Sequence, residues 1–250
     1  MTYTKLTFNI KSSPKPYLFI GSKIRGMLGY TLKEEVCVNP SYKCEGCYAA
    51  RECLFYRMYE LPNVTHRYRL NFKLYSKKYR FSIFLFDASM KESIKVERAM
   101  LRALERYPKV ESKIVEKKIK IPTKIPAVIL LRFEAPLRIK RQNRFARDTI
   151  GIEEILRSAA KRSEEIFGTD EGFDRNDRLP KVVSSSFGYK ELIRRSNKQQ
   201  SKMQIGGLMG EMVLTDLDSK SWRLLKIGEK IGVGKATVFG LGKYTIEEIA

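Results

Sequence analysis

The sequence is poor in the signals that mark secreted and membrane proteins. No apolar run approaches the roughly 18 residues needed to cross a bilayer, and the first ten residues, MTYTKLTFNI, lack the basic-then-apolar pattern of a signal peptide. The chain has only four cysteines, all between Cys37 and Cys53, whereas a disulfide scaffold would distribute them along the sequence. These absences predict a cytoplasmic protein with reduced thiols.

Acidic residues are also scarce. Asp and Glu total 28 against 49 Lys and Arg, which gives a formal net charge of +21. Such an excess favours a polyanionic partner, because each neutralised phosphate releases condensed counterions. Nucleic acid is the first choice and an anionic membrane surface the second. A disordered chain is excluded by a hydrophobic fraction of 43% with 13 Phe and 13 Tyr.

Hydrophobic periodicity divides the chain into two similar halves. The first half reads as strand, helix, two strands, helix and strand, the order of a ferredoxin-like unit. Ser22 is the expected cap of the first helix. The predicted bounds are 3–10, 22–36, 68–75, 79–86, 92–107 and 110–121.

The second half repeats this order after Pro122 and Pro126, which mark a linker. Its predicted elements are 128–133, 151–167, 182–193, 204–217, 221–232 and 243–249. We therefore expect an α+β protein of two tandem ferredoxin-like (RRM-like, βαββαβ) domains. They are residues 1–121, with a cysteine-rich insertion at 37–53, and residues 127–250, with a glycine-rich loop at 231–244.

The stretch IGVGKATVFGLGKY (231–244) resembles a nucleotide-binding loop but fits neither common motif. A P-loop requires glycine where Glu229 stands and Ser or Thr where Ala236 stands, and a dinucleotide fingerprint requires glycine at Thr237. What remains is a lysine-bearing loop whose backbone N–H groups can approach phosphates. The alternative is a pair of glycine-rich turns at the end of a helix.

Two basic runs, at 132–147 and 189–210, accompany the glycine stretch. Arginine grips phosphates through two N–H groups at once, and Ser, Asn and Gln can reach base edges and 2′-hydroxyls. The alternative for any one run is a solvated basic face. The residues predicted to bind RNA are Arg138, Lys140, Arg141, Arg144, Arg194, Arg195, Ser196, Lys198, Gln199, Gln200, Lys202, Gly232, Gly234, Lys235, Gly240, Gly242 and Lys243.

These stretches resemble a known family. FGYKELIRRSNKQQSKMQIGGLMGEM and IGEKIGVGKATVFGLGKY are similar to the C-terminal half of the CRISPR repeat-processing endoribonucleases, the Cas-six family of the RAMP superfamily. The glycines match its signature G-h-G-x5-G-h-G, where h is apolar, and GSKIRGMLGYTLKEE resembles its first helix. The likeness covers most of the chain and is strongest after residue 180.

The resemblance implies two tandem ferredoxin-like folds and cleavage of CRISPR precursor RNA once in each repeat. In this family the ribose 2′-OH attacks the adjacent phosphate without a metal or other cofactor. The products carry a 2′,3′-cyclic phosphate and a 5′-OH. The implied partners are repeat RNA and subunits of a CRISPR effector complex, with no membrane.

The reaction needs a base, an acid and positive charge beside the phosphorane. His66, the only histidine, lies after the first helix, although the cysteine segment intervenes. Under the resemblance, the catalytic candidates are His66, Tyr30 to orient the RNA, and Arg25 or Lys73 to stabilise the phosphorane. Some members lack a catalytic histidine, so an ordinary residue at the entry of a strand is the alternative for His66.

The cysteines follow the pattern Cys37-x6-Cys44-x2-Cys47-x5-Cys53. Two thiolates at C-x2-C spacing can hold one zinc ion, and the outer cysteines can complete a tetrahedral structural site. An iron–sulfur cluster is a weaker option, and four reduced thiols packed in a loop are the alternative.

Two rival functions remain at this stage. The first is a non-catalytic RNA-binding subunit of a CRISPR effector complex with the same fold. The second, a metal-dependent nuclease, is disfavoured because no spaced Asp/Glu cluster falls near the basic runs.

Overall fold

The computed structural model describes residues 1–16, 19–174, 176–196 and 201–249. The chain forms two compact units. The N-terminal unit comprises Thr2–Lys117, and the C-terminal unit runs from Lys118 to the end of the chain and includes Met1. The boundary falls a few residues before the expected linker. The Pro122 carbonyl accepts a 2.9 Å hydrogen bond from Trp222 Nε1, which holds this segment in the C-terminal unit.

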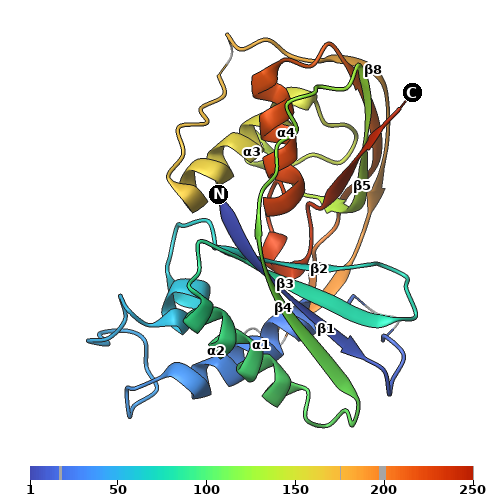
Figure 1. The fold of residues 1–250 in the computed structure, drawn as a ribbon. Helices are drawn as coiled ribbons and strands as arrows, with labels where there is room; N and C mark the ends of the chain where they lie inside the picture. The colour runs from blue at the N-terminus through green and yellow to red at the C-terminus, as the bar shows by residue number, and fades with distance from the viewer. Residues whose placement is uncertain (17–18, 175, 197–200, 250) are drawn as a thin grey trace. The chain divides into compact units, whose positions relative to one another are not determined.

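The N-terminal unit is a four-stranded sheet with two helices on one face (Figure 1). The strand order is β2-β3-β1-β4, and β3 runs antiparallel to both β1 and β2. This is the predicted βαββαβ arrangement. Its elements are β1 (Thr2–Ile10), α1 (Gly21–Val36), the π-helical turn η1 (Tyr56–Glu60), β2 (Tyr68–Phe72), β3 (Tyr79–Phe86), α2 (Met90–Ala103) and β4 (Val110–Lys118).

Hydrophobic pattern accounts for most of these elements, although several details differ from expectation: α2 spans Met90–Ala103 instead of 92–107, and β4 ends at Lys118 instead of residue 121. Alternate residues of β1, such as Leu6 and Phe8, are buried, as an amphipathic strand requires. The expected Ser22 cap is wrong: Ile20 occupies the N-cap without a side-chain hydrogen bond, and Ser22 lies inside α1. The second strand ends at Phe72 instead of residue 75.

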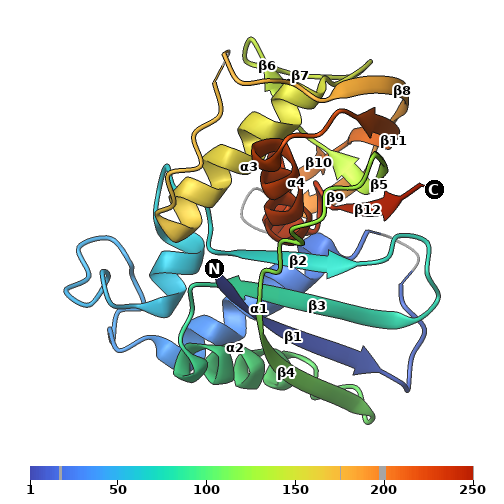
Figure 2. The same ribbon diagram turned by 45° about the horizontal axis from the view of Figure 1, so that its top comes forward.

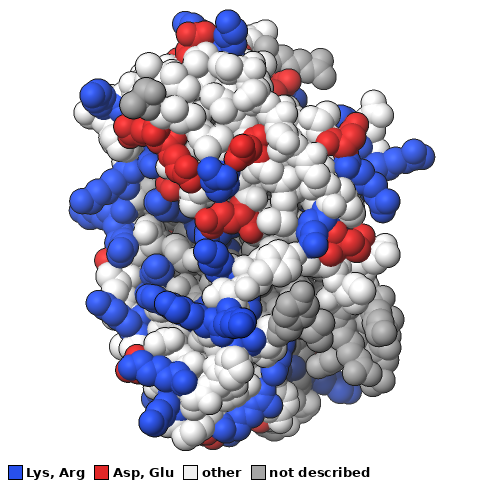
Figure 3. Space-filling view, turned by 90° about the vertical axis from the view of Figure 1, so that its right-hand side faces the viewer, with Lys and Arg blue, Asp and Glu red and all other residues white. Residues whose placement is uncertain are grey.

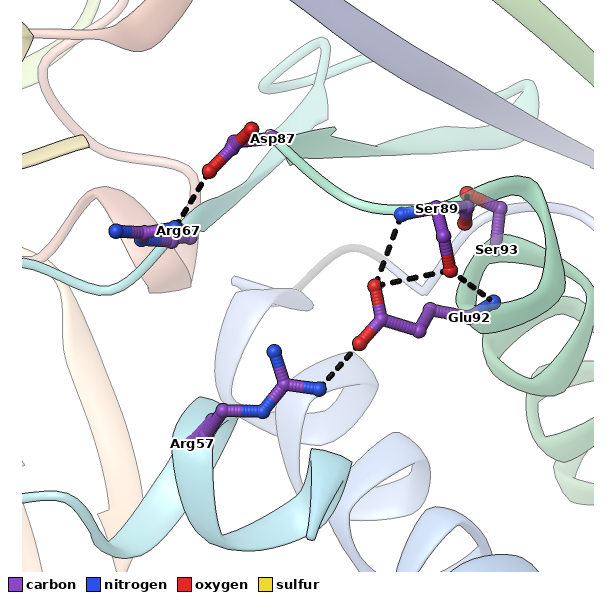
Figure 4. Close-up of polar contacts among 6 residues, drawn as sticks. All are labelled: Arg57, Arg67, Asp87, Ser89, Glu92 and Ser93. Atoms are coloured by element: carbon purple, nitrogen blue, oxygen red, sulfur yellow. Dashed lines mark hydrogen bonds and ion pairs between the residues drawn. The ribbon is translucent and has the colours of Figure 1, made fainter. Parts of the chain in front are cut away.

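Helix α2 begins with a capping box that also anchors η1 (Figure 4). Ser89 Oγ accepts a 3.2 Å bond from the Glu92 N–H, and the Glu92 carboxylate accepts a 2.9 Å bond from the Ser89 N–H. Arg57 of η1 donates to the same carboxylate. The start of α2 is therefore tied to the turn that precedes β2.

The C-terminal unit repeats the design with two added hairpins (Figure 2). Its sheet has the order β12-β5-β11-β8, which is again fourth, first, third and second strand of a βαββαβ unit. The elements are β5 (Val128–Leu137), β6 (Lys140–Arg141), β7 (Arg144–Phe145), α3 (Ile152–Phe167), β8 (Lys181–Lys190), β9 (Ile193–Ser196), β10 (Ser201–Gln204), β11 (Gly207–Thr215), α4 (Ser219–Ile231), the 3₁₀ turn η2 (Thr237–Phe239) and β12 (Tyr244–Glu248). The two tandem ferredoxin-like folds are confirmed.

Helices α3 and α4 bury their apolar faces on the sheet of the C-terminal unit. Leu156 and Ala159 of α3 and Leu225 of α4 join Leu131 and Leu214 of the sheet in one core. Within the described part of the chain, no helix is both long and apolar enough to span a bilayer.

Candidate functional site

Two of the predicted catalytic residues come together in the N-terminal unit, around a pair of tyrosines. The Arg25 guanidinium, on α1, lies 4.4 Å from the centre of the Tyr59 ring and donates a hydrogen bond to the Tyr68 hydroxyl. The ring of His66 lies 6.0 Å from that of Tyr68, centre to centre. We call Arg25, Tyr59, His66 and Tyr68 the Arg25 cluster. It places a cation and an imidazole on the same small group of aromatic rings.

The shape of α1 and η1 makes this cluster possible. Tyr59 lies on η1 and donates a 2.9 Å hydrogen bond to the carbonyl of Arg25. A Cβ at Gly29, one turn further along α1, would lie 2.7 Å from the Tyr59 ring. A glycine is therefore needed for the ring to pack on the helix. π-Helical turns are frequently found at functional sites.

Tyr68 is the buried centre of the cluster. Its side chain is fully buried, and burial raises its pKa to about 12, although the Arg25 charge acts in the opposite direction. The phenol is therefore protonated at neutral pH and acts as a hydrogen-bonding group rather than a base. Arg25 and His66 are half-buried. The cluster thus has a fixed interior and two side chains that solvent can reach.

Tyr30 and Lys73 lie elsewhere in the N-terminal unit. Tyr30 follows Arg25 by five residues on α1, so the two side chains point about 140° apart around the helix. Tyr30 is 69% exposed, and its pKa is raised by a hydrogen bond to Glu34. Lys73 is exposed beyond the end of β2, and four residues of strand, about 13 Å, separate Phe72 from Tyr68. Tyr30 and Lys73 are therefore not part of the Arg25 cluster, and the catalytic roles predicted for them stay predictions.

The glycine-rich loop packs into the C-terminal unit. Its amides donate inward: Val233 N–H to Gly242 O at 2.9 Å, Gly242 N–H to Pro136 O at 3.0 Å, and Gly234 N–H to Ser158 Oγ at 2.7 Å. Gly232, Gly234, Gly240 and Gly242 all have positive φ, a conformation that glycine adopts without strain. The glycines are therefore required by the turns themselves.

A buried arginine holds the start of this loop. Arg162 of α3 donates to the carbonyls of Gly232 at 2.9 Å and Ile231 at 3.1 Å, at the end of α4, and burial lowers its pKa to about 10. Within the loop, Lys235 is exposed, whereas Lys243 forms an ion pair with Glu134. Of these two lysines, Lys235 is therefore the better candidate for the predicted contact with RNA, which stays a prediction.

The first basic run forms a hairpin beside the loop. Strands β6 and β7 are joined by Gln142 and Asn143, which both have positive φ, as a tight two-residue turn requires. Arg138 and Lys140 lie over the Phe145 ring, 4.0 and 5.6 Å from its centre. The Lys235 N–H donates a 2.7 Å bond to the Arg138 carbonyl, so the hairpin and the glycine loop are neighbours.

Other members of this run have different environments. Arg147 lies 5.2 Å from the centre of the Tyr189 ring, and Arg144 is exposed. Arg141 forms an ion pair with Glu154, with N···O distances of 3.1 and 2.7 Å, and Glu154 also accepts the Gly151 N–H at the start of α3. We call Arg138, Lys140, Arg144, Phe145 and Arg147 the hairpin cluster.

The second basic run is described only in part. Arg194, Arg195 and Ser196 lie on β9, which pairs with β10, where Lys202 lies opposite Arg195. Lys198, Gln199 and Gln200 lie outside the described residues. The RNA contacts predicted for this run stay predictions.

Sequence reasoning did not single out a basic groove in the N-terminal unit. This open groove, with a volume of ≈ 360 Å³, is lined by Lys11, Lys77 and Lys78 together with the serines at 12 and 13. Lys11 also forms an ion pair with Glu111. Figure 3 shows a face of the molecule on which Lys and Arg side chains cover broad areas and acidic side chains occupy fewer places.

The tyrosines of the Arg25 cluster were also missed. Tyr59 and Tyr68 are separated from Arg25 by more than thirty residues, and only folding brings the three together. Gly29, four residues after Arg25 on α1, was the available signal, because a small residue leaves room for an aromatic ring.

The four cysteines are half-buried and reduced, in a segment without helix or strand that runs from the end of α1. All four line one cavity of ≈ 20 Å³. As they stand, no three His, Cys, Asp or Glu side chains among the described residues are close enough to share a metal ion.

Comparisons with known proteins agree with this architecture. Residues 131–244 match the family model described as CRISPR-associated endoribonuclease Cas6, and residues 1–79 match a second model described as an N-terminal domain. None of the curated proteins compared with the chain matches it.

Solved structures share the fold at low sequence identity. A Cas6 product complex of Thermus thermophilus has a TM-score of 0.64 at 14% identity, over 99% of this chain and 99% of that one. A Cas6 substrate mimic complex has a TM-score of 0.59 at 16% identity, over 99% of this chain and 100% of that one. A Cas6-related protein from Pyrococcus furiosus has a TM-score of 0.51 at 13% identity, over 100% of this chain and 99% of that one.

Proposed function

We propose that this protein cuts CRISPR precursor RNA by attack of a ribose 2′-hydroxyl, because residues 131–244 match the model of the CRISPR-associated endoribonuclease Cas6. The match supports the coarser function, an endoribonuclease that processes CRISPR RNA. The chemistry of the cut and the residues that perform it are the proposal.

The Arg25 cluster is the observation that carries the proposal. It unites a half-buried imidazole with a guanidinium fixed by two aromatic rings. Imidazole accepts and releases protons near neutral pH, and guanidinium binds phosphate oxygens in a planar fork. Of the four predicted catalytic residues, His66 and Arg25 share this cluster, whereas Tyr30 and Lys73 do not.

In the proposed reaction, the 2′-oxygen forms a bond to phosphorus and the bond from phosphorus to the 5′-oxygen breaks. His66 takes the proton of the 2′-hydroxyl or protonates the leaving 5′-oxygen, water accepts or supplies the other proton, and Arg25 balances the charge of the phosphorane. Tyr68 and Tyr59 hold the Arg25 guanidinium in place. The products are a 2′,3′-cyclic phosphate and a 5′-OH. The nucleophile belongs to the substrate, so this reaction needs no metal ion to activate a water.

We assign RNA binding in the C-terminal unit chiefly to the hairpin cluster and Lys235. Cations held over aromatic rings suit single-stranded RNA, because bases stack on rings while the cations meet phosphates. In the N-terminal unit, the lysines of the basic groove are further candidates for phosphate contacts. Arg141 and Lys243 are weaker candidates, because each already has an acidic partner.

A non-catalytic RNA-binding subunit is the second candidate function. The net charge of +21 and the basic surfaces support it equally well. What favours the nuclease is the pairing of His66 with Arg25 on one cluster, since RNA binding alone gives no reason for it.

The decisive experiment offers the protein repeat-containing RNA in EDTA, beside a matched RNA with one 2′-deoxy residue at the cut site. We expect cleavage of the first RNA only, with a cyclic phosphate on the upstream product. Tight binding of an uncut RNA would favour the subunit, and cleavage of the deoxy RNA or cleavage only with added magnesium would overturn the mechanism.

A further inference from the structure

The four cysteines are unexplained by RNA cleavage, and their burial is unusual. Cysteine used as packing is among the most fully buried residues, because it behaves as a small hydrophobe. Here all four are only half-buried, and none forms a disulfide. Packing alone therefore does not account for them.

All four cysteines line the same cavity although they come from different parts of the segment. Cys37 follows α1, Cys44 and Cys47 flank a turn closed by a 3.2 Å bond from the Cys47 N–H to the Cys44 carbonyl, and Cys53 leads into η1. The cavity, at ≈ 20 Å³, is about the size of one water molecule or ion. The four cysteines thus border a space that can hold one ion, although their side chains would have to move closer together to share it.

We propose that Cys37, Cys44, Cys47 and Cys53 bind one zinc ion as a closed, structural four-thiolate site. The Cys44-x2-Cys47 turn supplies two ligands, and the other two come from the ends of the segment. Binding draws the sulfurs inward to about 2.3 Å from the ion. With four protein ligands, no position stays open for a catalytic water.

The ion would join the end of α1 to the start of η1. Phe55 and Tyr56, directly before and within η1, also line the cavity, and Phe55 stacks on Tyr59 with ring centres 5.2 Å apart. Zinc would therefore fix the turn that places Tyr59 against Arg25. This proposal concerns metal binding alone and stands or falls independently of RNA cleavage.

The test measures zinc in the full-length protein purified under reducing conditions without a histidine tag. We expect about one zinc per chain. Substitution by cobalt should give the thiolate-to-cobalt charge-transfer absorption of a four-thiolate site. Cys44→Ser with Cys47→Ser should lose the metal, whereas Tyr48→Phe should retain it, because Tyr48 lies in the same segment and is 81% exposed.

Structural consequences give an independent readout. In hydrogen exchange, residues 37–60 should lose protection when a thiol reagent releases the zinc from wild-type protein, which avoids variants that fail to fold. Wild-type protein with four titratable thiols, no zinc and no uptake of zinc or cobalt would overturn the proposal. Iron with inorganic sulfide in place of zinc would overturn it as well.

Discussion

At the scale of single residues, the candidate site depends on contacts made through space. The sequence pointed to His66 because it is the only histidine and to Arg25 because it lies on the first helix. It could not show that Tyr68 lies between them, because Tyr68 reads in sequence as an ordinary strand residue. Tyr30 was predicted to act beside Arg25 because both lie on the first helix. In the structure, Tyr30 contacts Glu34 whereas Arg25 contacts Tyr68.

Arg25 should affect the chemical step more than binding. We expect Arg25→Ala to lower the single-turnover cleavage rate about 100-fold, the usual effect of removing one group that stabilises transition-state charge. The dissociation constant for RNA should change little, because one phosphate contact among many is lost. Lys23→Ala, an exposed cation on the same helix, serves as the control. Equal losses of rate and affinity in Arg25→Ala would indicate a binding residue instead.

Ionisation of Tyr68 should lower the free energy of unfolding at alkaline pH. Its folded pKa of about 12 exceeds the usual 10.0, so the stabilisation is fully present below pH 10 and is lost as the pH rises through 12. The shift of two pH units corresponds to about 3 kcal/mol. Chemical denaturation of wild-type and Tyr68→Phe protein should show their difference in unfolding free energy shrinking over this window. A difference that stays constant from pH 9 to 12 would contradict the assignment.

At the scale of elements, the pattern of apolar residues predicted the four α-helices and the strands of both four-stranded sheets, but it missed the two added hairpins and several strand ends. The errors have local causes: α1 begins without a side-chain cap, and β2 ends early, before the turn at Tyr75, whose φ is positive. The glycine stretch was recognised as a signature, but its spacing could not show that its amides bond to Pro136 and Ser158. The glycine motif therefore stabilises the fold of the C-terminal unit, in addition to resembling a family signature.

Gly242 should be essential to the glycine loop. A side chain there would overlap the Val233 carbonyl, in a backbone conformation with φ of +67°. We expect Gly242→Ala to lower the free energy of unfolding by about 3 kcal/mol or more. Gly188→Ala on β8, where a Cβ meets nothing within 4 Å, should change it by less than about 1 kcal/mol. Similar midpoints of denaturation for both variants would refute the structural role.

The hairpin cluster should contribute to RNA affinity through charge. Lys140→Gln with Arg144→Gln should weaken binding of repeat RNA and reduce the slope of log affinity against log salt by about 1.4, if each cation meets one phosphate. Lys161→Gln with Arg157→Gln on α3, which removes two cations paired with Glu165 and Glu153, is the matched control. An unchanged slope in the hairpin variant would place the RNA elsewhere.

At the scale of the whole molecule, two ferredoxin-like units divide the proposed work. The N-terminal unit carries the Arg25 cluster and the cysteine segment, and the C-terminal unit carries the glycine loop and the hairpin cluster. The duplication was visible in the sequence as a repeated order of elements, although the halves share no obvious residues. The position of the cut in the RNA could not be predicted from this sequence, because it depends on how the RNA binds to the protein.

The most direct measurement is the single-turnover cleavage rate of His66→Ala protein on repeat RNA, together with its RNA affinity. The account predicts that the rate falls about 100-fold or more, as expected on loss of a general acid or base, while the dissociation constant stays within a factor of about two. A His66→Ala protein that cleaves at the wild-type rate would contradict the central claim that the Arg25 cluster breaks the bond.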